Sequence, residues 1–372
     1  MKKLGFGTMR LPIINSDDSN INIEEFKKMV DEFMKKGFSY FDTAYIYHRG
    51  NSEKALKQAL VDRYPRESYT VTTKLPSHML KSLEDRDLIF NEQLARTGLT
   101  YFDYYWLHAI SRNNLVEGFE KYDCFNWLID KKNKGLVKHI GFSYHDDAKL
   151  LDEILTKHPE IEYVQLQINY LDWESDTIQA HKNYDVCVKH NKPVIVMEPI
   201  KGGELANVPK KVEAMFKQHD ANMSIASWAI RYVASLPNVM VVLSGMSNME
   251  QTIDNTTYMN DFKPLTKEEI EMCLKAAEII NDEKAIKCTA CSYCTEGCPN
   301  KIAIPSYFDM FNKVSVNPDN TVVFDAQKVR FERYTRDHGK PSDCIECGQC
   351  ENVCPQHLPI IENLKLVKGK FE

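Results

Sequence analysis

Over roughly the first 260 residues, short apolar runs alternate with longer segments whose apolar residues recur at helical spacing. Eight of the runs have the length of a strand. They are Lys3–Gly7, Ser39–Asp42, Tyr69–Lys74, Phe102–Leu107, His139–Phe142, Tyr163–Gln167, Pro193–Glu198 and Val239–Leu243. Several are nearly continuous in apolar residues, such as Val194–Met197, which is typical of strands buried on both faces of a parallel sheet.

The segments between these runs predict amphipathic helices. In the first of them, a stripe that ends before Gly37 is formed by Phe26, Met29, Val30, Phe33 and Met34. Further helices are predicted at about 52–63, 82–97, 120–133, 146–157, 175–190, 222–235 and 248–258. Eight strand–helix pairs in succession favour an α/β fold of the (β/α)8 TIM-barrel type. A doubly wound sheet is the alternative, but no G-x-G-x-x-G turn follows the first strand.

The chain continues past the last predicted strand–helix pair. Thr266-Lys-Glu-Glu269 forms a capping box and predicts a helix that runs to about Asn281. We expect a barrel at 1–262, a linking helix at 263–287 and a small domain at 288–372.

Two cysteine runs mark this last domain. They are Cys288-Thr-Ala-Cys291-Ser-Tyr-Cys294-Thr-Glu-Gly-Cys298-Pro299 and Cys344-Ile-Glu-Cys347-Gly-Gln-Cys350-Glu-Asn-Val-Cys354-Pro355. Both have the spacing C-x2-C-x2-C-x3-C-P, with which bacterial-type ferredoxins hold two 4Fe–4S clusters. In such a run the fourth cysteine binds the other cluster. The predicted ligand sets are therefore Cys288, Cys291, Cys294 and Cys354 for one cluster, and Cys344, Cys347, Cys350 and Cys298 for the other.

Zinc and disulfides are the alternatives for these cysteines. Zinc usually takes two separated pairs of ligands, which would leave half of each run unused. Disulfides would imply a secreted chain, and nothing else in the sequence does. Between the runs, we interpret 306–340 as a polar insert with a helix over Ala326–Arg336.

Composition adds limits on partners and location. The net charge is −6, from 47 basic and 53 acidic residues spread along the chain, so we expect no nucleic-acid partner. We see no signal peptide and no apolar run of the ~20 residues that a membrane span needs, so we expect a cytoplasmic protein. We interpret the three cysteines outside the runs, Cys124, Cys187 and Cys273, as structural or incidental.

Polar side chains occur where the second, third and fourth predicted strands end, which is where such barrels carry active sites. Asp42 ends the second strand, Tyr47 follows in the next loop, Lys74 ends the third strand and His108 ends the fourth. A tyrosine titrates near pH 10, and a neighbouring ammonium group lowers its pKa. An imidazole beside it can bind a substrate carbonyl and help relay the proton, so these residues predict a proton-transfer site.

The segments Asp42-Thr-Ala-Tyr-Ile-Tyr47, Val-Thr-Thr-Lys74 and Asp103-Tyr-Tyr-Trp-Leu-His108 resemble the aldo-keto reductases. So do Gly-Phe-Gly-Thr8, His-Ile-Gly-Phe-Ser143 and Leu-Gln167-Ile-Asn-Tyr170. With the cysteine runs, the chain resembles the branch of that family with a C-terminal ferredoxin-type domain. The resemblance implies hydride transfer from a nicotinamide cofactor to an aldehyde or ketone. Tyr47 would be the general acid, with Lys74 and Asp42 lowering its pKa, and His108 would orient the carbonyl.

The same resemblance implies a nicotinamide site. Ser143 and Gln167 would bind the carboxamide, although the usual Asn after that serine is Tyr144 here. Met197 takes the place of a stacking tyrosine. Gly202 and Gly203 have no side chain, so the backbone there can approach a pyrophosphate closely. An ordinary loop turn is the alternative explanation for these two glycines.

A second nucleotide segment follows the eighth strand. Its family-matching positions are Gly245, Ser247, Asn248, Gln251 and Asn255. Asn248 or Ser247 can cap the next helix, whose N-terminus suits a phosphate. The Lys and Arg that often hold the 2′-phosphate of NADP fall on Gly245 and Gln251, and Lys201 offers a substitute, so NADH and NADPH both stay open.

Three functional hypotheses follow. Nicotinamide gives two electrons as a hydride, whereas a 4Fe–4S cluster accepts one, so direct exchange between them is unfavourable. The first hypothesis is an NAD(P)H-dependent carbonyl reductase with structural or sensing clusters. The second is an electron-transfer enzyme in which a ferredoxin-like partner feeds FMN or substrate in the barrel. The third is a non-catalytic redox sensor. The complete proton-transfer site argues against the third, and of the first two we favour the reductase.

Overall fold

The computed structural model describes residues 2–15, 17–288, 292–316, 318–354 and 356–372, so the predicted ligand Cys291 lies outside the described residues. The chain divides into two compact units. The barrel unit comprises residues 1–202 and 226–270, and the cysteine-rich unit comprises residues 203–225 and 271–372.

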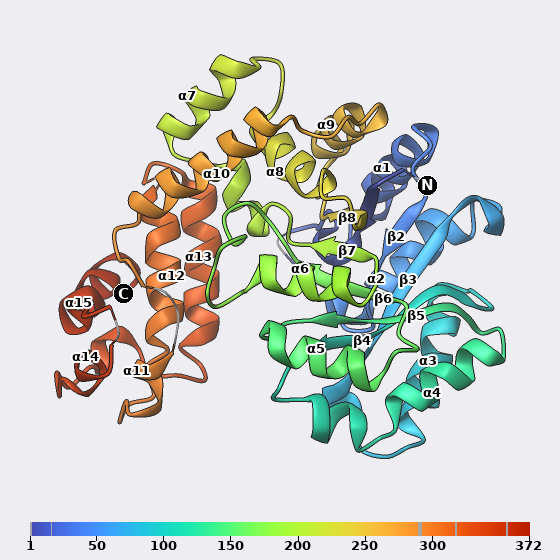
Figure 1. Cartoon of the computed structure of the whole chain (residues 1–372), viewed down its shortest axis with the longest axis horizontal. Helices are drawn as coiled ribbons and strands as arrows, with labels where there is room; N and C mark the ends of the chain where they lie inside the picture. Colours follow the sequence, from blue (N-terminus) through green and yellow to red (C-terminus); the bar gives the residue numbers. More distant parts are fainter. Residues whose placement is uncertain (1, 16, 289–291, 317, 355) are drawn as a thin grey trace. The chain divides into compact units, whose positions relative to one another are not determined.

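Parallel strands form a closed barrel in the order β1 to β8, and each pairs with its neighbours in sequence (Figure 1). They are β1 Leu4–Gly7, β2 Tyr40–Asp42, β3 Thr70–Pro76, β4 Phe102–Ile110, β5 Val137–Tyr144, β6 Tyr163–Gln167, β7 Val194–Met197 and β8 Val239–Ser244. β1 pairs with β8, which closes the sheet. The predicted barrel is therefore confirmed and the doubly wound alternative is wrong.

Large side chains fill the barrel instead of leaving a pore. The interior cluster consists of Tyr40, Tyr104, Trp106, Ile195, Val241 and Leu243. Gly141 makes room for this filling, because a Cβ atom there would lie 2.5 Å from the Trp106 ring and would also clash with the Tyr163 carbonyl oxygen. Aromatic packing at the centre therefore requires glycine on the neighbouring strand β5, where Gly141 pairs with Trp106.

Helices connect the strands. They are α1 Ile23–Lys35, α2 Ser52–Leu56, α3 Asp85–Thr97, α4 Cys124–Asn133, α5 Ala148–Lys157, α6 Ala180–Lys189, α8 Ile225–Ala234 and α9 Met249–Asn260. Short 3-10 or π turns occur at Thr8–Arg10, Tyr47–Gly50, Lys57–Val61, Arg66–Ser68, Ser77–Met79, Leu115–Glu120, Lys201–Ala206 and Pro341–Asp343. Of the predicted stripe in α1, Phe26, Met29, Val30 and Phe33 are buried and Met34 is partly buried. Asn22 caps this helix by accepting a hydrogen bond from the Glu25 N–H. The segment predicted at 175–190 becomes helical only from Ala180.

The cysteine-rich unit is helical. It contains α7 Lys210–His219, most of α10 Lys267–Asp282, α11 Tyr293–Glu296, α12 Ile304–Val316, α13 Thr321–Tyr334, α14 Gln349–Asn352 and α15 Ile360–Phe371. α12 and α13 run side by side (Figure 1). The expected polar insert at 306–340 is wrong in part, because α12 supplies buried residues such as Phe308 and Met310 to the core of this unit. The predicted helix at 326–336 is α13, which begins earlier.

None of the helices in the described part of the chain combines the length and the apolar character that a membrane crossing requires.

Candidate active site and cysteine pockets

The proton-transfer residues come from consecutive strands at one end of the barrel. Asp42 is the last residue of β2, and Tyr47 lies in the short turn that follows. Lys74 lies in β3, opposite Trp106 of β4, and His108 of β4 lies opposite Pro76. β3 and β4 extend two and three residues beyond their predicted ends, so these side chains project from strand rather than loop.

Lys74 is the centre of this group. Its Nζ lies 2.5 Å from Oδ1 of Asp42, donates to the Thr43 carbonyl oxygen at 2.7 Å and lies 3.4 Å from the Tyr47 hydroxyl. Lys74 is 1% exposed and Asp42 is 2% exposed. The other carboxylate oxygen of Asp42 lies 3.5 Å from the amide nitrogen of Gln165. A buried ion pair therefore holds an ammonium group beside the phenol.

Burial decides the protonation states here. Burial raises the pKa of Asp42, and Lys74 offsets part of that rise. Burial lowers the pKa of Lys74, but Asp42 and Tyr47 raise it by more than burial lowers it. The net pKa of Lys74 is therefore raised, and the ammonium form is favoured. The pKa of Tyr47 is raised, because burial outweighs the downward effect of Lys74 and because Asp42 also acts upward. The expectation that Asp42 and Lys74 together lower this pKa is wrong for the net shift, and the phenol keeps its proton.

His108 lies across from the phenol. Its ring centroid is 5.8 Å from that of Tyr47, edge to face. Burial, with smaller contributions from Lys74 and two other histidines, lowers the pKa of His108 well below its usual value. The next residue, Ala109, has a left-handed φ of 58°, and its N–H donates to Ser143 Oγ at 2.6 Å. The imidazole is therefore neutral and its backbone is held from the neighbouring strand.

Two residues near the site in sequence do not face it. The His48 ring is buried and bonded to Leu11 N at 3.1 Å and to the Asp18 carbonyl oxygen at 2.8 Å, so it fixes a loop. Trp106 lies in the barrel interior. Arg49, the next residue after His48, is exposed.

A buried network behind Lys74 was not predicted. The Glu53 carboxylate accepts hydrogen bonds from Thr73 Oγ1 at 2.8 Å and Gln93 Nε2 at 2.9 Å. Gln93 also donates to the Lys74 carbonyl oxygen at 3.1 Å and accepts from the Tyr105 hydroxyl at 2.5 Å. These contacts fix the backbone of β3 where Lys74 emerges.

The predicted carboxamide residue Gln167 belongs to a second unpredicted network. Its Nε2 donates to Asp172 at 3.1 Å, and Asn169 donates to the same carboxylate oxygen at 2.8 Å. The other oxygen of Asp172 pairs with Lys201 Nζ at 2.5 Å. Burial would raise the pKa of Asp172, but Lys201 and the amide donors lower it overall. Lys201 is therefore committed to Asp172 rather than extended toward solvent.

The segment after β8 is organised by side-chain caps. Asn248 accepts from the Gln251 N–H at 2.9 Å at the start of α9, as its predicted capping role requires. The Gln251 side chain in turn accepts from Ser247 N at 2.7 Å. Asn255 donates to Ser244 Oγ at 2.7 Å, which anchors the helix to β8.

The remaining predicted cofactor residues lie in turns or strand ends. Met197 ends β7 and is partly buried, and Gly202 has a left-handed φ of 66°. Gly245 follows β8. Gly203 also has a positive φ, 104°, but it is the first residue of the cysteine-rich unit.

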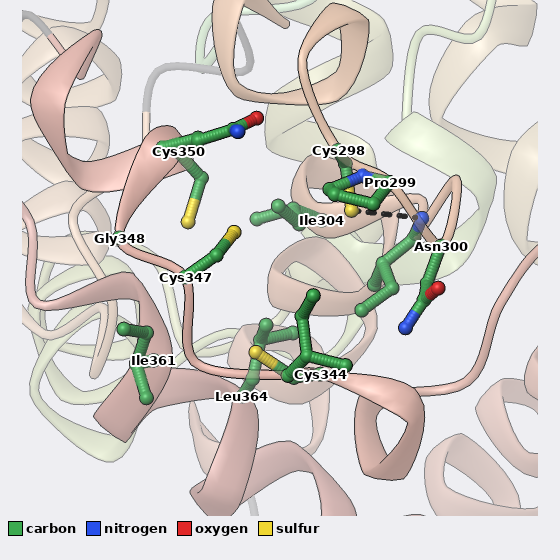
Figure 2. A pocket seen from close by; sticks show the side chains of 13 residues that line it. Cys298, Pro299, Asn300, Ile304, Cys344, Cys347, Gly348, Cys350, Ile361 and Leu364 are labelled. Carbon is green, nitrogen blue, oxygen red and sulfur yellow. Dashed lines mark hydrogen bonds between the residues drawn. The ribbon is translucent and has the colours of Figure 1, made fainter.

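The cysteine-rich unit brings the predicted ligands together in two pockets. One is lined by Cys344, Cys347, Cys350 and by Cys298 of the other run, as Figure 2 shows. In this view the sulfurs of Cys347 and Cys350 point toward one another. The other pocket is lined by Cys288, Cys294 and Cys354. Each pocket thus combines the start of one run with the fourth cysteine of the other.

Local backbone geometry explains this arrangement. In each run, the residue after the second cysteine has a left-handed backbone. This residue is Ser292 in the first run, with a φ of 66°, and Gly348 in the second, with a φ of 74°. Each begins a short helix, α11 or α14, that carries the third cysteine. Apolar side chains such as Ile304 and Leu364 line the Cys298 pocket, and Ile302 N donates to Cys298 Sγ at 3.4 Å. Sulfur ligands in an apolar, hydrogen-bonded setting fit an iron–sulfur cluster.

Comparisons with known proteins match two families along the chain. Residues 3–278 match the "Aldo/keto reductase family", and residues 287–358 match the "4Fe-4S dicluster domain". The chain is 22% identical over 302 residues to the "Uncharacterized oxidoreductase YqkF" of Bacillus subtilis (strain 168), covering 73% of this chain and 94% of that protein.

Solved structures are similar in fold. The holo form of aldo-keto reductase AKR11C1 from Bacillus halodurans matches with a TM-score of 0.60 and 20% identity, covering 74% of this chain and 91% of that chain. An aldo-keto reductase from Klebsiella pneumoniae in complex with NADPH matches with a TM-score of 0.57 and 18% identity, covering 73% of this chain and 90% of that chain.

Proposed function

Because the chain belongs to the aldo/keto reductase family and carries a 4Fe–4S ferredoxin-type domain, we propose that this oxidoreductase reduces an aldehyde or ketone with NADPH or NADH. The observation that carries the proposal is the buried group at the strand ends, in which Lys74 lies 2.5 Å from Asp42 and 3.4 Å from the Tyr47 hydroxyl.

In the proposed reaction Tyr47 donates its proton to the carbonyl oxygen as the hydride reaches the carbonyl carbon. The raised pKa of Tyr47 keeps that proton in place beforehand. As negative charge develops on the phenol, the ammonium group of Lys74 stabilises it, and Asp42 holds the ammonium group in position. Neutral His108 donates or accepts a hydrogen bond to orient the carbonyl without adding a charge.

We propose Ser143 and Gln167 as the carboxamide contacts of the cofactor. Asp172 occupies the NH2 group of Gln167, which leaves its oxygen to accept from the carboxamide. The bound NADPH of the Klebsiella pneumoniae protein supports a nicotinamide cofactor here. The remaining contacts are proposed at Met197, Gly202, Gly203, Gly245, Ser247, Asn248, Gln251 and Asn255.

We further propose two 4Fe–4S clusters with the crossed ligand sets, Cys344, Cys347, Cys350 and Cys298 for one and Cys288, Cys291, Cys294 and Cys354 for the other. The two cysteine pockets support this assignment. Such clusters supply one-electron chemistry when bound. The buried proton-transfer group favours carbonyl reduction, and a cluster-fed route to FMN or substrate is the alternative.

The test is NADPH and NADH oxidation by anaerobically purified holoprotein with a panel of aldehydes and ketones. Tyr47→Phe is expected to lower kcat by a factor on the order of 10²–10⁴, as for loss of a general acid, while cofactor affinity persists. Tyr122→Phe, on the turn before α4, is the matched control and should keep wild-type activity. Undiminished turnover in Tyr47→Phe would refute the assigned acid, and absence of any carbonyl-dependent oxidation in wild type would favour the alternative.

A further inference from the structure

The predicted nucleotide segment after β8 lacks a cation. Gly245 and Gln251 occupy positions that often hold the charged residues of the family. Lys201, the substitute suggested by the sequence, is paired with Asp172 at 2.5 Å. Backbone N–H groups at the start of α9 can bind a phosphate, and a charge-assisted donor beside them would strengthen that contact.

Arg10 lies between the two glycine turns of the proposed cofactor site. A Cβ atom placed on Gly202 would lie 3.2 Å from an Arg10 guanidinium nitrogen, and one on Gly245 would lie 3.4 Å from Arg10 Cβ and Cδ. The arginine side chain therefore lies along Gly245 and reaches Gly202. Any larger residue at either position would crowd it.

The backbone of Arg10 is held in this place. Ser247 Oγ donates to the Arg10 carbonyl oxygen at 2.8 Å. On the other side, the next residue, Leu11, donates its N–H to the buried ring of His48 at 3.1 Å. The short turn Thr8–Arg10 after β1 is thus tied to the loop after β8 and to the loop after β2.

The guanidinium group is available for a ligand. Arg10 is exposed, and within the described residues no carboxylate forms an ion pair with it. This contrasts with Arg96 and Arg112, which are bound to carboxylates at 2.6 and 2.7 Å. An unpaired guanidinium between two glycines offers planar, bidentate donors that match a phosphate.

We propose that Arg10 binds a phosphate group of the nicotinamide cofactor and supplies the charge that Lys201, Gly245 and Gln251 do not. This inference rests on the proposed function. The phosphate is either the 2′-phosphate of NADPH or the pyrophosphate that NADPH and NADH share. The chemistry of recognition is the same for both, and comparing the two cofactors distinguishes them.

The test measures NADPH and NADH affinity of the holoprotein by quenching of tryptophan fluorescence and by calorimetry. Arg10→Gln is expected to weaken NADPH binding by about tenfold and to reduce its salt dependence, as loss of a charge-assisted contact does. Equal weakening for NADH assigns the pyrophosphate, and weakening for NADPH alone assigns the 2′-phosphate. Arg10→Lys should recover part of the affinity, because charge returns without the bidentate geometry.

Arg112→Gln is the matched control, since it removes the same charge from an exposed loop position after β4. It should leave both affinities unchanged. Wild-type affinity of Arg10→Gln for both cofactors would overturn the inference while leaving the proposed function intact. Failure of the wild-type protein to bind either cofactor would instead overturn the proposed function.

Discussion

Replacing Asp42 by Asn tests the buried ion pair on which the proposed chemistry depends. The change keeps the size of the side chain but removes the charge 2.5 Å from Lys74 Nζ. The ammonium group would keep only the Thr43 carbonyl oxygen at 2.7 Å and the Tyr47 hydroxyl at 3.4 Å. Burial lowers the pKa of Lys74, and Asp42 is the group that most strongly opposes this effect. Without the Asp42 charge, the pKa of Lys74 must fall.

The cost follows from that burial. Breaking a buried pair by removing one partner typically destabilises a protein by about 3–5 kcal/mol, because an uncompensated charge remains. Both residues are at most 2% exposed, so solvent cannot screen the loss. We expect Asp42→Asn to lose about 3–5 kcal/mol at pH 7, and Asp42→Asn combined with Lys74→Met to recover about half of it.

Tryptophan fluorescence during urea unfolding reports this effect on the barrel alone. All four tryptophans belong to the barrel unit, and they are Trp106, Trp127, Trp173 and Trp228. The control is Asp130→Asn, which breaks an exposed pair with Lys134 of 2.6 Å and should cost less than about 1 kcal/mol. A loss below about 1 kcal/mol in Asp42→Asn, or a double variant less stable than the single one, would refute the reasoning.

Three further predictions concern the clusters, the barrel packing and pH. Cys298→Ala should lower bound iron and sulfide by roughly half, whereas Cys124→Ala, outside both runs, should leave them unchanged in metal analysis. Gly141→Ala should destabilise the barrel by about 3 kcal/mol in urea unfolding, because its Cβ would overlap the Trp106 ring. The folded pKa of His108 lies well below its usual value, so below about pH 6.5 the unfolded chain binds a proton that the folded chain does not. The unfolding free energy should therefore fall with pH below about 6.5, and His108→Gln should make that fall shallower.

The barrel was predictable because its strands are short and apolar and because each is followed by an amphipathic segment. The Phe26 stripe in α1 is an example in which periodicity alone identifies the buried face. α7 was not predicted, since it buries only Val212 and Phe216 and offers little periodic signal. α15 was missed although Ile360, Leu364 and Val367 recur at helical spacing.

Long-range contacts set the limit for the site. Asp42, Lys74 and His108 could be placed because strand ends of a barrel converge at one rim. Asp172 could not be predicted from the sequence, because its role depends on an ion pair with Lys201, which lies 29 residues further along the chain. The net direction of the Tyr47 pKa also required the structure, since the sequence indicates neighbouring charges but not how strongly burial acts on the phenol.

Transfer of deuterium from NADPH labelled at both C4 positions tests the central claim most directly. The account predicts one deuterium on the carbinol carbon of the product from wild-type holoprotein, and a rate of transfer lower by a factor on the order of 10²–10⁴ in Tyr47→Phe. A reduced product without deuterium, or transfer at the wild-type rate in Tyr47→Phe, would contradict hydride delivery in the barrel with Tyr47 as the acid.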